Sequence, residues 1–320
     1  MHKLAFIAIT GLVASAACIG AAAAIGGRDF SDGLEDFSFF DGRPHCEAVA
    51  GAGATSRDLD WNDGDHIGVN LLGHASYTPG SGDKVHASGD PQLLAHLRIR
   101  HGTVELDCRG WRNRTKELAI TLPGRTFTKF EVTGTNLTLD KLDQDHVSIT
   151  IAGSGKIQAS GKLQDNVKLT IAGSGEMNLG EISARSGKME IAGSGTIKAD
   201  TIAIDDLKMA IAGSGRTEIG QLTSRTVETG IAGSGTMIAK GSADDLKIEI
   251  AGSGRADFGG VTSRNARVEI GGHGDVDIAP TDLAKVNIGG SGDVNLHSNP
   301  KQLQTDIGGS GRIHRLGPNT

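Results

Sequence analysis

The sequence predicts an all-β fold: a right-handed parallel β-helix (a solenoid) of about ten coils, with a β-rich cap at its N-terminal end. Three observations support this prediction. A glycine-rich segment recurs every 18 to 20 residues, apolar and polar residues alternate on both sides of it, and no segment has a convincing helical period. A repeat of this regularity is typical of a solenoid, in which each repeat forms one coil.

The repeat is the pentapeptide "IAGSG", with the later variants "IGGHG" and "IGGSG". A degenerate copy precedes it, because Val132 and Gly134 stand 19 residues before Ile151 and Gly153. We therefore expect the stack of coils to run from about Lys129 to Leu316. The nine repeats begin at Ile151, Ile171, Ile191, Ile211, Ile231, Ile250, Ile270, Ile288 and Ile307.

Each coil is expected to hold a strand, a glycine corner, a second strand and a return turn. Apolar residues alternate before the corner (Val167, Leu169) and after it (Met177, Leu179), which places one face of each strand inside. Parallel connections are right-handed, so the coils should wind in that sense. The Gly-x-Gly corner supplies backbone angles that residues with a Cβ atom avoid. The corner glycines are Gly153, Gly155, Gly173, Gly175, Gly193, Gly195, Gly213, Gly215, Gly233, Gly235, Gly252 and Gly254.

Charged residues form a stripe six positions before each repeat isoleucine. From the second coil onward the sign of the charge alternates, so each charge should face an opposite one in the neighbouring coils. Exposed pairs contribute only about 0.2–1 kcal/mol each, so we interpret the stripe as support for the register. It consists of Asp145, Asp165, Arg185, Asp205, Arg225, Asp244, Arg264, Asp282 and Lys301.

A second stripe, three positions before each isoleucine, is mostly basic. It is interpreted either as solvated lysines that protect the sheet from edge pairing or as a binding face for an anionic polymer. The formal net charge of −6 argues against nucleic acid as a partner, because phosphate binding needs a basic surface. The stripe consists of Lys168, Lys188, Lys208, Lys247, Arg267 and Lys285.

Residues 25–125 differ in composition from the repeat domain, 126–320, and are predicted to form the cap. They contain both tryptophans and the only tyrosine. The segment "LLAHLRIRHGTVELDC", which ends at Cys108, is interpreted as a strand, a glycine turn and a second strand. A cap is expected because an unpaired coil end is an aggregation hazard. The alternative is an aromatic-lined ligand site in this region.

Residues 1–24 are predicted to be a secretory signal peptide. Lys3 precedes an apolar run, and Ala22 to Ala24 provide a cleavage site. An uncleaved membrane anchor is one alternative, because the run approaches the length that crosses a bilayer, and a lipidated N-terminus at Cys18 is another. After cleavage we expect no transmembrane segment. The protein should then be exported to the periplasm, the outer envelope or the extracellular space.

Cleavage would leave two cysteines, Cys46 and Cys108. In an oxidising compartment an even pair favours a disulfide, which would tie the cap together. The alternative is two unrelated buried thiols. No cluster of histidine and cysteine with zinc spacing accompanies them, so the pair does not predict a metal site.

No residue is assigned a catalytic, cofactor-binding or metal-binding role. The segment "GGHGDVDI" at Gly271 is similar to a calcium-binding nonapeptide, but Val276 stands where the ligand aspartate belongs. Glycoside cleavage needs two facing carboxylates, so four aspartates on neighbouring coils are the strongest enzymatic candidates. We interpret them as surface acids, because other coils hold basic or neutral residues at the same strand positions. They are Asp257, Asp275, Asp277 and Asp293.

The "IAGSG" coils, the preceding "LPG" at Leu122 and the signal peptide together resemble the bacterial GIN-domain family (DUF2807), whose members are described as auto-transporter adhesin heads. The resemblance covers about Thr126 to Arg315 and depends on the Gly-Ser-Gly repeat at this spacing. It implies a right-handed β-helix and an envelope or extracellular location. It brings no catalytic residues.

The leading hypothesis is an exported, non-enzymatic β-helix that binds another macromolecule or a surface through its solvent-facing sheets. A polysaccharide lyase or hydrolase on the same scaffold is the alternative, and a purely structural envelope component is a third. No cofactor is expected.

Overall fold

The computed structural model describes residues 44–108 and 117–317. They form two compact units, which are described separately. The N-terminal unit holds residues 44–108, 117–188 and 195–205, and the C-terminal unit holds residues 189–194 and 206–317. The predicted signal peptide, with Cys18, lies outside the described residues, as does Trp111.

The fold class is a parallel β-solenoid, as the repeat predicts. Strands make up 70% of the structure and helix 2%, and the strands wind into about nine turns, close to the predicted ten. The right-handed sense of the winding stays a prediction. Two strands, β13 (Glu176–Gly193) and β14 (Thr196–Gly213), have residues in both units.

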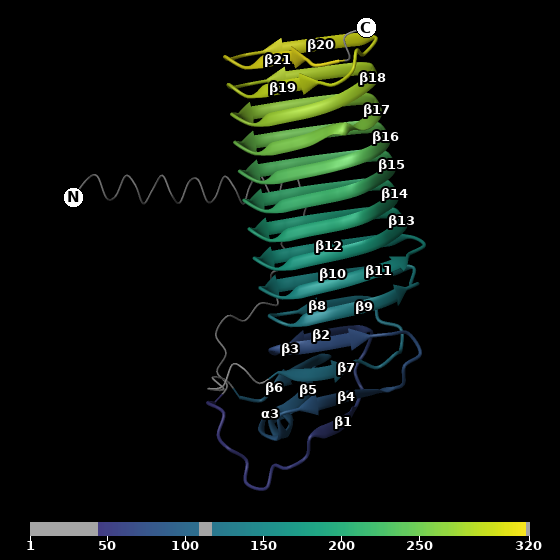
Figure 1. The fold of residues 1–320 in the computed structure, drawn as a ribbon, viewed down its shortest axis with the longest axis vertical. Helices are drawn as coiled ribbons and strands as arrows, with labels where there is room; N and C mark the ends of the chain where they lie inside the picture. Colours follow the sequence, from purple (N-terminus) through teal and green to yellow (C-terminus); the bar gives the residue numbers. More distant parts are fainter. Residues whose placement is uncertain (1–43, 109–116, 318–320) are drawn as a thin grey trace, which may run out of the picture. The chain divides into compact units, whose positions relative to one another are not determined.

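In the C-terminal unit, successive coils pair in parallel and in register (Figure 1). Ile231 pairs with Ile250, and Ile250 pairs with Ile270, which is the stacking that the repeat predicts. The first three strands of this unit each run from one glycine corner to the next, and the later ones are shorter. The strands are β15 (Arg216–Gly233), β16 (Thr236–Gly252), β17 (Arg255–Gly272), β18 (Asp275–Ile288), β19 (Asp293–Leu296), β20 (Gln302–Ile307) and β21 (Arg312–Arg315).

In the N-terminal unit, the coils have two sides. β8, β10 and β12 pair in parallel on one side, and β9, β11 and β13 pair in parallel on the other. Val132 pairs with Ile151, which confirms the predicted degenerate coil. The strands are β8 (Lys129–Val132), β9 (Asn136–Leu142), β10 (His146–Gly153), β11 (Lys156–Lys162) and β12 (Asn166–Gly173).

The parallel ladder begins before Lys129, so its predicted start was wrong. β2 (His66–Asn70) pairs in parallel with β8, and β3 (Gly73–Tyr77) pairs in parallel with β9. Residues 66–77 therefore form an earlier coil, although they lack the pentapeptide. The chain then pairs with the other side of this coil and continues toward the repeats only at β8. This excursion, residues 78–128, interrupts the period and hides the first coil from a search for repeats.

Together with β1, the excursion forms the predicted β-rich cap. β4 (Lys84–Gly89) pairs antiparallel with β1 (Ser56–Asp60) and with β7 (Leu118–Thr121). β5 (Leu97–Arg100) pairs antiparallel with β6 (Thr103–Leu106). β7 also pairs in parallel with β3, and β6 with β2. The cap therefore supplies a pairing partner for each of the two strands of the first coil, β2 and β3.

A short helix, α3 (Pro91–His96), lies where the first strand of the quoted cap segment was predicted to begin. The Asp90 carboxylate caps it by accepting hydrogen bonds from the backbone N–H groups of Gln92 (3.0 Å) and Leu93 (3.3 Å). Pro91 stands in the first turn, where its missing N–H costs nothing. The glycine turn and its two flanking strands, β5 and β6, are as predicted. The Asp-Pro pair is a helix start signal that the strand prediction left out.

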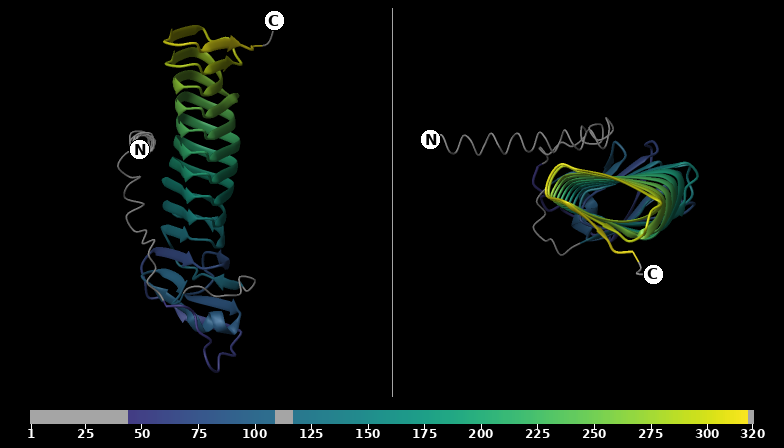
Figure 2. Two further views of the ribbon diagram at one scale, coloured as in Figure 1. Left: turned by 90° about the vertical axis from the view of Figure 1, so that its left-hand side faces the viewer. Right: turned by 90° about the horizontal axis from the view of Figure 1, so that it is seen from above.

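The repeat isoleucines form the core of the coils. Eight of the nine are 3% exposed or less, and Ile307, in β20, is 40% exposed. Along the stack, the coils of the C-terminal unit lie over one another (Figure 2). The burial and the pairing together confirm that the eight buried isoleucines point inward.

The two glycines of each corner are needed for different reasons. The first, for example Gly213, has a φ of 122°, and a Cβ atom there would lie 2.5 Å from the carbonyl oxygen of Gly193. The second, for example Gly235, has no positive φ, but a Cβ atom would lie 2.6 Å from Cγ2 of Ile211. The backbone conformation therefore requires the first glycine, and the close approach of an isoleucine from the preceding coil requires the second.

The aromatic residues at the cap form a buried cluster. Trp61, Tyr77, Phe127 and Phe130 pack edge to face with ring centroids 5.0 to 6.0 Å apart. Trp61 is 6% exposed and Tyr77 is 1% exposed. The Tyr77 hydroxyl donates to the carbonyl oxygen of Arg125 (3.0 Å), and burial raises the pKa of Tyr77. These rings are therefore core, which supports the cap interpretation over an aromatic-lined ligand site.

Candidate functional site

Asp277, one of the candidate acids, is buried in a polar cluster of the C-terminal unit. Its side chain is 6% exposed. Oδ2 accepts a hydrogen bond from Nη2 of Arg255 (2.8 Å), and Oδ1 lies 2.9 Å from Nε2 of His297 and accepts from Nδ2 of Asn295 (3.0 Å). Gly259 leaves room for the imidazole, because a Cβ atom there would lie 2.8 Å from the ring. Both carboxylate oxygens of Asp277 are therefore engaged inside the protein.

The other candidate acids bind backbone amides. Oδ1 of Asp275 accepts from the N–H of Asp293 (3.4 Å), and Oδ1 of Asp293 accepts from the N–H of Arg312 (3.1 Å). Oδ1 of Asp257 accepts a hydrogen bond from the backbone N–H of Gly259 (3.4 Å). The register places Asp257 directly beside Asp277. The structure thus brings these acids to neighbouring coils, as predicted, and gives each of them a hydrogen-bond partner.

The charge stripe forms ion pairs between coils. Arg225 differs from the prediction, because its guanidinium donates to both oxygens of Asp206 (2.7 and 2.6 Å) and not to Asp205. Two aspartates follow each other at this point, and the second one takes both hydrogen bonds. The side chains are largely exposed, so the pairs fix the register more than they stabilise the fold. The predicted pairs that form are Arg185–Asp165 (3.3 Å), Arg264–Asp244 (3.2 Å) and Lys301–Asp282 (2.7 Å).

The basic stripe has counter-ions on the same face. Nζ of Lys247 lies 3.1 Å from the carboxylate of Glu228 and 2.7 Å from that of Glu249, and Nζ of Lys208 lies 3.1 Å from Glu228. Burial alone would raise the pKa of Glu228, but hydrogen bonds from the two lysines outweigh it and hold the pKa below its usual value. Where its basic residues are paired in this way, the stripe presents little positive potential to an anionic polymer.

Two shallow grooves lie on the solvent-facing surface, one in each unit. The C-terminal groove has a volume of about 520 Å³. Its wall includes Glu249, which is paired with Lys247, and Glu269, which is paired with Arg267, so much of its polar surface is already engaged. Its lining also includes Ala251, Gly271, Asn287, Gly289, Asp306 and Gly308.

The N-terminal groove has a volume of about 430 Å³ and crosses four coils, those of β9, β11, β13 and β14. The pairing places Gln158 between Thr138 and Asn178 on neighbouring coils. No prediction included these residues. A signal was nevertheless present, because polar residues occur three positions after the second corner glycine in successive coils. The polar lining consists of Thr138, Asp140, Gln158, Ser160, Asn178, Lys198 and Asp200.

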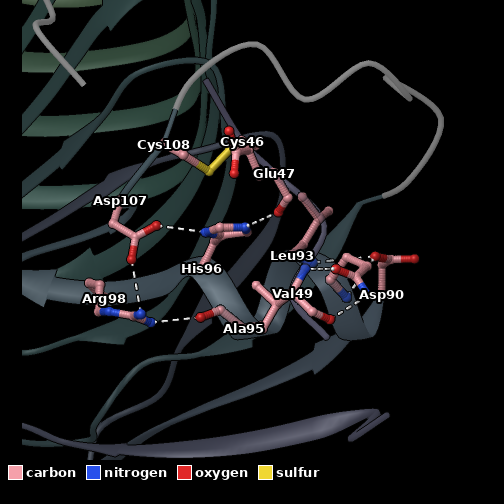
Figure 3. Close-up of a disulfide and its surroundings, with 11 residues drawn as sticks. Cys46, Glu47, Val49, Asp90, Leu93, Ala95, His96, Arg98, Asp107 and Cys108 are labelled. Carbon is pink, nitrogen blue, oxygen red and sulfur yellow. Dashed lines mark hydrogen bonds and ion pairs between the residues drawn. A yellow bond between two sulfur atoms is a disulfide. The ribbon is translucent and has the colours of Figure 1, made fainter. Parts of the chain in front are cut away.

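The predicted disulfide between Cys46 and Cys108 is present in the cap (Figure 3). Beside it, the Asp107 carboxylate lies 2.8 Å from Nδ1 of His96 and 2.9 Å from Nη2 of Arg98 in β5. Nε2 of His96 lies 2.8 Å from the carbonyl oxygen of Glu47. His96, Asp107 and Cys108 are close enough to hold a metal ion, but the Cys108 sulfur is oxidised and is not a thiolate ligand. The cluster anchors the chain near Cys46 to α3 and β6.

The protein is therefore a parallel β-solenoid that has shallow grooves on its outer surface. The sequence matches the model of the family described as "Putative auto-transporter adhesin, head GIN domain" over residues 65–224 and 188–300. These matches cover more than half of the chain, so the protein belongs to this family. The match begins beside β2, well before the start at Thr126 that the resemblance implied. In the ranges 44–108 and 117–317, no helix is long and apolar enough to cross a bilayer.

The chain is also similar to solved crystal structures. A putative lipid binding protein from Parabacteroides distasonis is 21% identical, with 81% of this chain and 95% of that chain covered and a TM-score of 0.44. A putative adhesin from the same organism is 17% identical, with 82% and 96% covered and a TM-score of 0.47. A putative adhesin from Parabacteroides merdae is 16% identical, with 81% and 95% covered and a TM-score of 0.45. No curated protein matches the sequence.

Proposed function

We propose that the protein is an exported, non-enzymatic, adhesin-like module that binds a surface or an extended macromolecule through the outward faces of its coils. Membership of the GIN-domain family supports the adhesin-like role. The disulfide supports export, because such bonds persist in oxidising compartments.

The observation that carries the proposal is the in-register ladder on the outer face of each unit. Equivalent side chains stand next to one another in successive coils, and each groove runs across several coils. Solenoids use such extended, regular surfaces to bind their partners. A ligand that spans several coils gains many weak contacts at once, which suits adhesion to a repetitive surface.

A polysaccharide lyase or hydrolase receives less support. Such an enzyme needs two carboxylates that are free to face a substrate. Asp277 is instead buried against Arg255 and His297, and Asp275 and Asp293 accept backbone hydrogen bonds. The candidate acids therefore serve the packing of the coils.

The binding function is tested by a pull-down of envelope and cell-surface extracts with the purified protein. We expect saturable retention of an envelope component, and we expect cell fractionation to find the protein outside the cytoplasm. Cytoplasmic protein, or an envelope defect in a deletion strain with no binding partner retained, would contradict the proposal.

The non-enzymatic part is tested with polygalacturonate and other polysaccharides as substrates, for which we expect no turnover. Turnover that disappears in the triple variant Asp275→Asn, Asp277→Asn, Asp293→Asn, while its melting temperature stays near that of the parent, would show that the protein is an enzyme.

A further inference from the structure

We propose that the N-terminal groove is a binding site for a neutral glycan chain, which lies across the coils and is held by hydrogen bonds to its hydroxyl groups. The inference rests on the proposed binding function and assigns it a site and a class of ligand. It is carried by the shape of the groove, the free polar groups in its lining, their spacing and their charge.

The shape of the groove follows from a change of register at its centre. Ala159 pairs with Leu139, but the next pair joins Gly161 to Leu142, and a similar shift occurs on the other side toward β13. Ser160 alone therefore spans the bend at which each neighbouring coil has two residues. An added Cβ atom at Gly161 would collide with the Leu142 carbonyl oxygen, so the close approach depends on this glycine. The shorter middle coil leaves a hollow between its neighbours, as bulges next to binding sites do.

Most polar groups in this hollow have no partner among the residues that the structure describes. The side chains of Thr138, Asp140, Gln158, Ser160 and Asp200 make no hydrogen bond or ion pair with any residue that the structure describes. The C-terminal groove differs, because its glutamates are paired with basic neighbours. A ligand in the N-terminal groove can therefore form hydrogen bonds without breaking internal ones, which is where a polar contact gains most.

The chemistry and spacing of these groups suit sugar hydroxyls. A hydroxyl group both donates and accepts, so it pairs equally with amide, hydroxyl and carboxylate side chains. Thr138, Gln158 and Asn178 are in register on successive coils, so a ligand along the stack meets one such group about every 4.8 Å, and four coils span about 14 Å. A polymer with hydroxyl groups on every unit fits this regular row.

An extended peptide fits the groove less well. Peptides that bind to sheets add a strand to an exposed edge, where their backbone finds free hydrogen-bonding groups. β11, at the floor of the groove, is paired in parallel with β9 on one side and β13 on the other. No strand edge is open there, so a ligand must be recognised by the outward side chains.

The charge of the lining favours a neutral ligand over an anionic one. Asp140 and Asp200 lie on the outermost of the four coils, and Lys198 is the only basic residue among the lining groups. Two carboxylates against one ammonium repel uronic acid polymers and leave hydroxyl groups unaffected.

The test uses a glycan array and then isothermal titration with cellohexaose, mannohexaose and hexagalacturonate. We expect the purified protein to bind at least one neutral glycan and to reject hexagalacturonate. The double variant Gln158→Ala, Asn178→Ala should raise the Kd by about tenfold, because two amide groups lose their hydrogen bonds to the ligand. Gln221→Ala, which removes an exposed amide of the C-terminal unit, is the matched control and should leave the Kd unchanged.

A second pair of substitutions tests the charge argument. Asp140→Asn with Asp200→Asn should preserve binding of the neutral glycan and allow hexagalacturonate to bind. The side chains of Asp140 and Asp200 are exposed, so this double variant should melt at the same temperature as the parent protein.

Three results would overturn the assignment: no neutral glycan bound on the array, equal affinity of the Gln158→Ala, Asn178→Ala variant, or capture of an extended peptide at this groove instead. If the double variant retains the envelope component as well as the parent does, the binding function stands and the groove assignment fails.

Discussion

Replacing Gly213 with alanine should destabilise the C-terminal unit strongly, although it adds only one methyl group. The residue has a φ of 122°, which an L-residue adopts at a cost of about 1–3 kcal/mol. The new Cβ atom would also lie 2.5 Å from the Gly193 carbonyl oxygen, a backbone atom that cannot move away alone. Overpacking of this kind costs about 1–3 kcal/mol more. The free energy of unfolding should therefore fall by about 2–6 kcal/mol.

The assay is thermal unfolding followed by circular dichroism, with Ser214→Ala as the control. At roughly 2–4 °C per kcal/mol for a domain of this size, Gly213→Ala should lower the melting temperature by about 5–20 °C. Ser214 is exposed, and its backbone N–H makes the corner hydrogen bond to Gly193, so its hydroxyl is dispensable. The control should stay within about 0.5 kcal/mol of the parent. Equal melting temperatures of the two variants would refute the geometric account of the corner.

Other changes test the ion pairs, the disulfide and the acid sensitivity of the coils. Arg225→Glu should replace the ion pair with Asp206 by a repulsion and lower the free energy of unfolding by about 1 kcal/mol at low salt. Arg225→Gln is the neutral control. An effect that survives 1 M salt would argue against an electrostatic cause. Cys46→Ser opens a loop with a sequence separation of 62 and should cost about 4 kcal/mol, and a reductant should then lower the melting temperature of the parent but not of the variant. The lowered pKa of Glu228 contributes stability above its unfolded pKa of about 4.3 that is lost as the pH falls through the folded value. Denaturant midpoints measured from pH 6 to pH 3 should therefore fall less for Glu228→Gln than for the parent, and parallel curves would contradict this assignment.

The coils were predictable because their stabilising contacts repeat in the sequence. One pentapeptide sets the inward isoleucine and the glycine corner, and a period near 20 sets which residues become neighbours. The pairing of Ile231 with Ile250 and of Ile250 with Ile270 follows from spacing alone. The disulfide could also be predicted, because signal peptide cleavage would leave only one pair of cysteines.

The parts of the structure that could not be predicted depend on features that do not repeat in the sequence. The first coil, residues 66–77, lacks the pentapeptide, and its neighbours in the ladder lie beyond a long excursion. The helix α3 is too short to show a helical period, and only the Asp90–Pro91 pair marks its start. The N-terminal groove arises from a register shift at Ser160, which depends on how many residues each coil places at one bend. Such a count is invisible until the strands are aligned in space.

The excursion between β3 and β8 shows how cheaply a coiled chain accepts an insertion. Pairing His66 with Lys129 closes a segment of 63 residues, whereas neighbouring repeats close segments of about 20. Because the entropy of closure grows only with the logarithm of length, the added cost is roughly 1 kcal/mol. A domain-sized addition can therefore enter at the junction of two coils while the ladder on either side keeps its register.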